Sequence, residues 1–280
     1  MSGFDGRVCV VTGAGAGIGR ALTLALARRG ARLAISDLDE DGLAETAALA
    51  ERHGAEVHAT RLDVADREAF TAYADEVVAR FGTVNQVYNN AGIWLARSIL
   101  DSSFEDFERL WSIDLWGVVH GTKLFLPHLI ASGEGHVINV SSINGILAQA
   151  DTSHYCSAKF AVRGFTESLR LELEASGHPV RALTVHPGGV HTGIASTALR
   201  YALENGEELS ERDVRLEKLY NNLILRLDPD KAAESILKAV AKDRTRVLVG
   251  NDAKLIDLTV RVAPSFVLGV SGKVLKRLWR

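Results

Sequence analysis

Residues 7–29 read Arg-Val-Cys-Val-Val-Thr-Gly-Ala-Gly-Ala-Gly-Ile-Gly-Arg-Ala-Leu-Thr-Leu-Ala-Leu-Ala-Arg-Arg. The apolar, β-branched run from Arg7 to Thr12 predicts a strand that is buried on both faces. The leucine spacing after Arg20 predicts a helix, so a glycine-rich turn lies between a strand and the start of a helix. Backbone N–H groups and the helix dipole would both face a phosphate there, and this arrangement predicts an anion site.

The glycines of this turn have separate physical roles. Gly13 allows a tight turn, Gly17 lets a pyrophosphate approach the backbone, and Gly19 permits close packing of the helix on the strand. Their spacing is Gly-x-x-x-Gly-x-Gly, whereas Gly-x-Gly-x-x-Gly is the commoner form. A glycine-rich loop by itself is often only a turn. The strand before it and the helix after it favour a dinucleotide-binding site.

An acidic residue follows the second predicted strand. Residues 32–36 read as a strand that ends at Asp37, about 20 residues after the glycines, which is the spacing of the acid that binds an adenosine ribose. Its carboxylate can accept hydrogen bonds from two ribose hydroxyls but would repel a 2′-phosphate. The next residue is Leu38, so no arginine follows directly to compensate. The sequence therefore favours NAD as cofactor, with NADP as the alternative.

The rest of the chain alternates between predicted strands and predicted helices. Such alternation implies right-handed βαβ units and a parallel sheet, which define an α/β fold. The 280 residues contain no linker and no repeat, and they fit a single domain over 1–280. Further strands are expected at 56–62, 84–88, 135–140, 180–185 and 246–249, and helices at 39–52, 66–81, 104–132, 153–176 and 228–242.

Tyr155 and Lys159 form a pair that could carry acid–base chemistry. In a helix, the spacing Tyr155-x-x-x-Lys159 places both side chains on one face, one turn apart. An ammonium beside a phenol favours the phenolate, and we expect it to lower the tyrosine pKa from its usual value of about 10. Ser142 follows an apolar strand and could hold the same substrate oxygen. Such a pair is common on helix surfaces, and only its context makes it significant.

Four motifs together resemble the short-chain dehydrogenase/reductase family: Thr12-Gly-Ala-Gly-Ala-Gly-Ile-Gly19, Asn90-Ala-Gly92, Ser142 and Tyr155-x-x-x-Lys159. The resemblance covers residues 5–250. It implies a Rossmann fold of about seven parallel strands flanked by helices on both faces. It also implies hydride transfer between a nicotinamide and a carbonyl or alcohol carbon.

The resemblance implies a role for each motif residue. Tyr155 would be the acid–base, Lys159 would lower its pKa and bind the nicotinamide ribose, and Ser142, with Ser141 as the alternative, would hold the substrate oxygen. Asp63 and Val64 would meet the adenine. The segment from His186 to Thr192 resembles the part of the family that holds the nicotinamide amide. The implied cofactor-binding residues are Gly13, Ala16, Gly17, Ile18, Gly19, Asp37, Asp63, Val64, Asn90, Ala91, Gly92, Tyr155, Lys159, Pro187, Gly188, Val190 and Thr192.

Asp114 departs from the family pattern. Members usually have an asparagine in the motif Asn-x-x-Gly, where this chain has Asp114-Leu-Trp-Gly117. In the family that asparagine helps to hold a water linked to the active-site lysine, partly through its main-chain oxygen. An ionised Asp114 would oppose phenolate formation at Tyr155, whereas a protonated, buried one would imitate the amide. We expect a working enzyme in which Asp114 is tolerated; the alternative is a non-enzymatic nucleotide-binding scaffold, which Ser142, Tyr155 and Lys159 argue against.

The last third of the chain is expected to form a substrate lid and a tail. Residues 193–228 correspond to the family's lid, and their apolar residues suit an apolar ketone or secondary alcohol. Trp94, Ile143 and Gln149 could line the opposite wall. The tail at 261–280 has five basic residues and no acid, and we expect it to pack on its own domain or on a subunit, with an anionic membrane surface as the alternative.

Composition limits the other possibilities. The net charge is −3 and the pI about 6.3, so nothing suggests a nucleic-acid partner. Cys9 and Cys156 do not form a disulfide framework, and with no secretory signal visible we expect the cytoplasm. We assign no metal site. The family resemblance suggests a homotetramer or a homodimer that pairs the helices near 104–132 and 153–177.

Overall fold

A computed structural model describes residues 3–204, 214–215, 217–218, 221 and 225–264. Its centre is a parallel sheet of seven strands in the order β3-β2-β1-β4-β5-β6-β7. The predicted α/β Rossmann fold is therefore confirmed. The strands are β1 (Val8–Thr12), β2 (Arg32–Asp37), β3 (Val57–Arg61), β4 (Gln86–Asn89), β5 (Gly135–Val140), β6 (Val180–Pro187) and β7 (Arg246–Val249).

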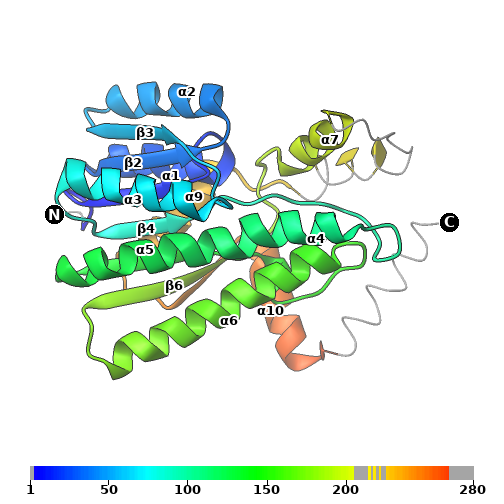
Figure 1. Ribbon diagram of the computed structural model, residues 1–280. Coiled ribbons are helices and arrows are strands. Elements are labelled where there is room, and N and C mark those ends of the chain that lie inside the picture. The colour runs from blue at the N-terminus through cyan, green and yellow to red at the C-terminus, as the bar shows by residue number, and fades with distance from the viewer. Residues whose placement is uncertain (1–2, 205–213, 216, 219–220, 222–224, 265–280) are drawn as a thin grey trace.

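Helices cover both faces of the sheet (Figure 1). Helices α1, α2 and α9 pack on one face, and α3, α5 and α6 pack on the other. Each face has its own apolar cluster, because strands such as β1 and β5 bury every residue along their length. The helices are α1 (Gly17–Ala27), α2 (Glu40–Glu51), α3 (Arg67–Phe81), α4 (Phe104–Trp111), α5 (Gly117–Ala131), α6 (Ser153–Ala175), α7 (Ile194–Glu204), α9 (Pro229–Val240) and α10 (Asn251–Val262).

The strand order reverses direction at β1. This strand pairs with β2 on one side and with β4 on the other, so the connections leave in opposite directions. In open parallel sheets, ligands bind in the crevice that such a reversal creates at the carboxyl ends of the strands. That edge lies at the right of Figure 1, and the candidate site residues follow the strands there.

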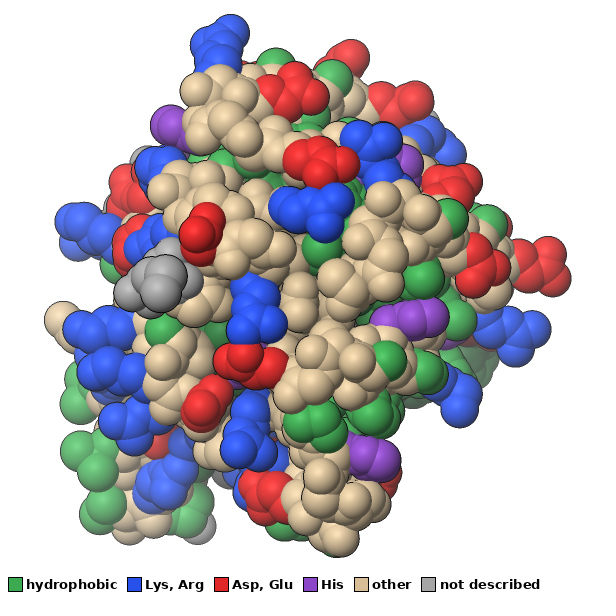
Figure 2. Space-filling view, turned by 90° about the vertical axis from the view of Figure 1, so that its left-hand side faces the viewer, with side chains coloured by type: hydrophobic (Ala, Val, Ile, Leu, Met, Phe, Trp, Pro, Cys, Tyr) green, Lys and Arg blue, Asp and Glu red, His purple; other side chains and the backbone are tan. Residues whose placement is uncertain are grey.

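The opposite edge of the sheet has a different character. Figure 2 shows the face that holds the amino ends of the strands, where Lys and Arg side chains lie beside Asp and Glu side chains. Arg7 pairs with Glu134 across this end of the molecule, and Arg32 pairs with Glu56. Mixed charge of this kind suits a solvated surface.

One predicted helix needs a correction. Residues 104–132 were expected to form one regular helix, but a π-helical turn, η1 (Ser112–Trp116), separates α4 from α5. A π turn takes up one more residue than an α turn and often occurs at functional sites. Asp114 lies in this turn and is fully buried.

The C-terminal third is described only in part. Asp228 caps α9 and Pro229 occupies its first turn, as predicted. Of the predicted lid, α7 and a few residues up to 221 are described, and the segment 225–228 rejoins the sheet region. Most of the predicted basic tail, residues 265–280, lies outside the described residues. Within the described part, no helix is long and apolar enough to cross a bilayer.

Candidate active site

The turn after β1 has the geometry that its glycines predict. Gly13 and Gly17 have φ values of +68° and +53°, a region that side-chain-bearing residues rarely adopt. A Cβ on Gly19 would lie 1.9 Å from the carbonyl oxygen of Gly13. Helix α1 begins at Gly17 with no side-chain cap from Ala16, so its first N–H groups remain available to a ligand. This cradle fits the pyrophosphate of a dinucleotide.

Asp37 lies directly beside this turn. One carboxylate oxygen accepts a hydrogen bond from the backbone N–H of Gly15 at 2.7 Å, and the other accepts from Asp39 N–H at 3.0 Å. Arg20, for which no role was predicted, donates to the carbonyl oxygen of Gly15 at 2.6 Å and pairs with Glu45 at 2.8 Å. Asp37 thus lies at the carboxyl end of β2 in direct contact with the glycine-rich turn.

The segment Asn90-Ala91-Gly92 is fastened to the same turn. The Asn90 side chain donates to the carbonyl oxygens of Thr12 at 3.0 Å and Gly13 at 3.2 Å. The backbone N–H groups of Asn90 and Ala91 both donate to the Thr12 hydroxyl oxygen at 3.1 Å. Thr12, a motif residue for which no role was predicted, thus connects the ends of β1 and β4.

Asp63 and Val64 differ in exposure. Asp63 is exposed, and its carboxylate accepts a hydrogen bond from Ala65 N–H at 2.9 Å. Val64 is buried against Gly117, where an added Cβ would lie 2.8 Å from a Val64 methyl. The Val64 side chain therefore supports the junction of η1 and α5, so any contact with adenine would come from the outer part of this segment.

The segment after β6 lies against the glycine-rich turn. Strand β6 runs to Pro187, two residues beyond the predicted end at Val185. Thr192 lies so close to Gly17 that a Cβ there would be 2.9 Å from the Cβ of Thr192. Asp252, which the sequence analysis missed, accepts a hydrogen bond from Gly189 N–H at 2.7 Å.

This segment is also tied to the far end of the lid. The backbone N–H of His191 donates to the Leu227 carbonyl at 2.8 Å, and Val190 and Leu227 form an isolated β-bridge. A Cβ on Gly188 would lie 2.2 Å from an Asp252 oxygen, so a larger residue there would displace the Asp252 side chain. Hydrogen bonds thus hold this segment in place at the edge of the sheet; it contains Pro187, Gly188, Val190 and Thr192.

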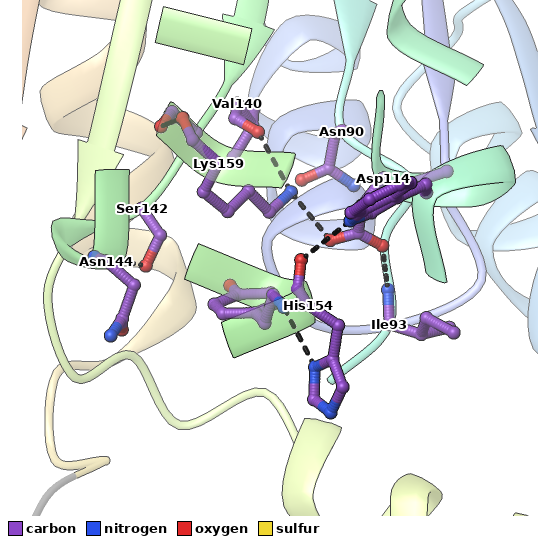
Figure 3. A network of polar contacts seen from close by, with 12 residues as sticks. Asn90, Ile93, Asp114, Val140, Ser142, Asn144, His154 and Lys159 are labelled. Carbon is purple, nitrogen blue, oxygen red and sulfur yellow. Dashed lines mark hydrogen bonds and ion pairs between the residues drawn. The ribbon is translucent and has the colours of Figure 1, made fainter. Parts of the chain in front are cut away.

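Ser142 and Lys159 lie near one another at this edge (Figure 3), and Tyr155 lies beside Lys159 on α6. The Lys159 ammonium lies 5.6 Å from the centroid of the Tyr155 ring and donates to the Val140 carbonyl at 3.3 Å. The Ser141 hydroxyl donates to the carbonyl of Lys159 at 2.7 Å, whereas the Ser142 hydroxyl accepts from the backbone N–H of Asn144 at 3.1 Å and acts to lower the pKa of Tyr155. The geometry therefore favours Ser142 over Ser141 as the serine beside the phenol.

The electrostatics of Tyr155 correct one expectation. Burial raises the pKa of the Tyr155 phenol, Lys159 lowers this pKa, and Asp114 raises it again. Lys159 acts in the predicted direction, but the net pKa lies above the ordinary value of a tyrosine. The prediction of a lowered pKa was wrong because burial and the Asp114 carboxylate together outweigh the ammonium.

Two buried histidines near the centre have structural roles. His154 packs edge-on against Phe107, with ring centroids 5.4 Å apart. His186 lies with Nδ1 2.9 Å from the Ser142 carbonyl, and because a carbonyl only accepts, Nδ1 must donate. Burial lowers the pKa of His186 to about 4, so the ring stays neutral and holds the Ser142 backbone in place.

The predicted substrate-lining residues lie at different depths. Trp94 packs with Tyr155 and Leu110 in a small apolar cluster, together with Ile93 and Leu95. Ile143 is partly buried at the start of η2 (Ile143–Gly145), and Gln149 is exposed on the segment before α6. Trp94 therefore belongs to the same apolar cluster as Tyr155, whereas Gln149 is exposed to solvent. No group of three or more metal-ligand side chains occurs among the described residues.

A model of the short chain dehydrogenase family matches residues 7–201. The chain belongs to this family. The Mycobacterium tuberculosis protein named oxidoreductase SadH is 50% identical to this short-chain dehydrogenase over 265 residues, covering 95% of this chain and 94% of SadH. The trans-4-hydroxycyclohexanecarboxylate dehydrogenase of Sinomonas cyclohexanicum is 34% identical over 236 residues, covering 81% of this chain and 87% of its own.

A solved structure agrees with this assignment. The short-chain dehydrogenase/reductase of Burkholderia phymatum, determined in complex with NAD, superposes with a TM-score of 0.84. It is 30% identical in sequence, and the match covers 94% of this chain and 96% of the other. This protein is therefore an oxidoreductase of the short-chain dehydrogenase family, with a dinucleotide site of the NAD type.

Proposed function

We propose that this short-chain dehydrogenase is an NAD-dependent enzyme that interconverts an apolar secondary alcohol and its ketone. The observation that carries the proposal is the meeting of Ser142, Tyr155 and Lys159 next to the glycine-rich turn. When bound at this edge, a nicotinamide cofactor supplies the hydride acceptor for oxidation or the hydride donor for reduction. A screen of secondary alcohols and ketones with NAD(H) and NADP(H) tests it, and no turnover with any pair would refute it.

The proposed mechanism assigns each side chain one task. The Tyr155 oxygen takes the proton of the alcohol in oxidation and gives a proton to the ketone oxygen in reduction. The Ser142 hydroxyl binds the same substrate oxygen and fixes its position. Lys159, held at the Val140 carbonyl, contributes positive charge near the phenol and a donor for the cofactor ribose. Asn90 and Thr12 keep the edge rigid by joining β1 to β4.

The surroundings of the phenol support an apolar substrate. Ile93, Trp94, Leu95 and Leu110 form the apolar cluster with Tyr155, so a substrate carbon skeleton would lie against them. The Sinomonas relative is named for a cyclic secondary alcohol, and we carry that substrate class over as a proposal. Cyclohexanols are therefore suitable first members of the screen.

Cofactor choice should depend on Asp37. Removing its charge in Asp37→Ser should raise the kcat/KM for NADP relative to NAD by about tenfold or more, because a 1.4 kcal/mol change in repulsion is a factor of ten. Arg20 is bound to the Gly15 carbonyl and to Glu45, and Gly15 is also the residue that Asp37 contacts, so the guanidinium charge would favour a 2′-phosphate in that variant. Steady-state kinetics with both cofactors measures the ratio.

The matched control is Asp41→Asn, which removes an exposed charge from the first turn of α2. It should leave the NADP/NAD ratio unchanged. If both variants shift the ratio equally, general surface charge and not Asp37 sets the preference. If the wild type itself has the higher kcat/KM with NADP, then NADP and not NAD is the cofactor.

We also propose a homotetramer or a homodimer that pairs α4–α5 and α6. One face of α6 is exposed along its length, with Phe160 at 40% and Leu171 at 57% exposure. A Cβ on Gly164, on the same face, would meet nothing within 4 Å, so another helix could approach closely. Apolar residues beside small ones on a helix face are typical of a packing surface.

Leu171→Glu should therefore shift the protein to a smaller species. A charge in the centre of an apolar interface has no partner and must be desolvated. Size-exclusion chromatography with light scattering measures the mass. The control is Leu100→Glu, at a leucine that is 93% exposed in the loop before α4 and should not change the mass. A monomeric wild type would exclude the assembly.

We propose the cytoplasm as the compartment of this protein. The two cysteines, Cys9 and Cys156, are buried free thiols, which fit a reducing compartment.

A further inference from the structure

Asp114 is held at both of its carboxylate oxygens. One oxygen accepts a hydrogen bond from the backbone N–H of Ile93 at 2.7 Å, and the other lies 3.0 Å from the Lys159 ammonium (Figure 3). The carboxylate is fully buried, and the Lys159 side chain is only 5% exposed. The π-helical turn η1 aims Asp114 directly at the lysine. An asparagine at this position could not form an ion pair with Lys159, whereas the Asp114 carboxylate does.

The chain closes over this ion pair. A Cβ on Gly92 would lie 3.3 Å from both the Asp114 oxygen and the Lys159 nitrogen, so the backbone of Gly92 covers the contact. Charges shielded from water interact much more strongly than exposed ones. The charges of Asp114 and Lys159 therefore both affect the pKa of Tyr155.

The described ionisable groups near Tyr155 are few. Lys159 and Cys156 lie on α6 with Tyr155, and Asp114 faces it from η1. Arg109, on α4, acts on Asp114. Lys159 supplies the positive charge that favours the phenolate, and Asp114 supplies a negative charge at almost the same place. At the phenol, Asp114 therefore opposes the effect of Lys159: the lysine lowers the pKa of Tyr155 and the aspartate raises it.

We propose that Asp114 is a positioning residue that neutralises the Lys159 ammonium, so that Tyr155 keeps its proton at neutral pH and the site favours ketone reduction. This inference rests on the proposed function of Tyr155 as the acid–base. In reduction, the Tyr155 O–H bond breaks and its proton joins the ketone oxygen as hydride reaches the carbonyl carbon. In oxidation, the alcohol proton must join a Tyr155 phenolate as the carbinol hydrogen leaves as hydride, and that phenolate forms only in alkaline solution.

The test compares the wild type with Asp114→Asn. The amide oxygen can still accept from Ile93 N–H, while an NH2 group replaces the oxygen that faces Lys159, so the side chain carries no charge. Removing the negative charge leaves Lys159 unopposed, so the midpoint of phenolate formation should move down by about one pH unit or more. Ultraviolet difference titration of tyrosinate measures this in the protein without substrate. The same variants with Tyr155→Phe isolate one signal from those of the five tyrosines in the chain.

A second readout uses activity. In Asp114→Asn, the rise of alcohol-oxidation kcat/KM with pH should shift to lower pH by the same amount, and oxidation at pH 7 should increase about tenfold. Glu108→Gln, which removes an exposed charge from α4, should leave both profiles unchanged. If Asp114→Asn does not fold, Asp114→Ser serves as the uncharged substitute.

The outcomes separate this inference from the proposed function. Coincident tyrosinate titrations of the wild type and Asp114→Asn would overturn the inference, because they would show a protonated, neutral Asp114. A shifted titration without turnover of any alcohol or ketone would support the electrostatic role and refute the proposed reaction. A shift in both titration and rate profile supports the inference.

Discussion

Tyr155→Phe is expected to lower turnover by about 10²–10⁴-fold, the usual contribution of a general acid or base. The substitution removes only the phenol hydroxyl, and it keeps the ring in its apolar cluster with Leu110 and Trp94. The fold and the glycine-rich turn are untouched, so NADH should bind with unchanged affinity. Stopped-flow or steady-state rates with a secondary alcohol measure turnover, and NADH fluorescence measures the affinity for NADH.

The matched control is Tyr73→Phe. Tyr73 lies in the core on α3, with 1% exposure, and losing its hydroxyl should leave the rate within a few-fold of the wild type. Unchanged turnover of Tyr155→Phe would remove the phenol from the mechanism. Loss of NADH affinity together with turnover would instead point to a collapsed site.

Short-range geometry made much of this site predictable. The positive φ angles of Gly13 and Gly17 and the close approach at Gly19 follow from a strand–turn–helix of this spacing. The position of Asp37 follows from the length of one βα unit. Each of these features depends on residues that are near one another in the sequence.

The parts that were missed depend on contacts between distant segments. Asp252 reaches Gly189 from the start of α10, and His186 reaches Ser142 from the neighbouring strand. The π turn at Asp114 has the same apolar pattern as an ordinary helix, so periodicity alone did not reveal it. The raised pKa of Tyr155 depends on burial, which a spacing of four residues does not express.

Lys159→Met is expected to remove turnover and to destabilise the protein by about 3–5 kcal/mol, since one partner of a buried ion pair is lost. The remaining Asp114 carboxylate would be fully buried with only the Ile93 N–H as partner. The double variant Lys159→Met/Asp114→Asn removes both charges, so its unfolding free energy should recover most of the loss while its turnover stays absent. Denaturant unfolding of the four proteins gives the coupling energy.

The pH dependence of this loss gives a second, independent check. Burial already raises the pKa of Asp114 above the unfolded value of 3.8, and removing Lys159 takes away the charge that opposes this rise. A carboxyl with a raised folded-state pKa binds more protons when folded, so the unfolding free energy of Lys159→Met should fall as pH rises above about 3.8. The deficit relative to the wild type should be largest at neutral pH and smallest in acid. A deficit that does not change with pH, or one that Asp114→Asn fails to reduce, would mean that lost packing of the lysine stem and not an unpaired carboxylate causes it.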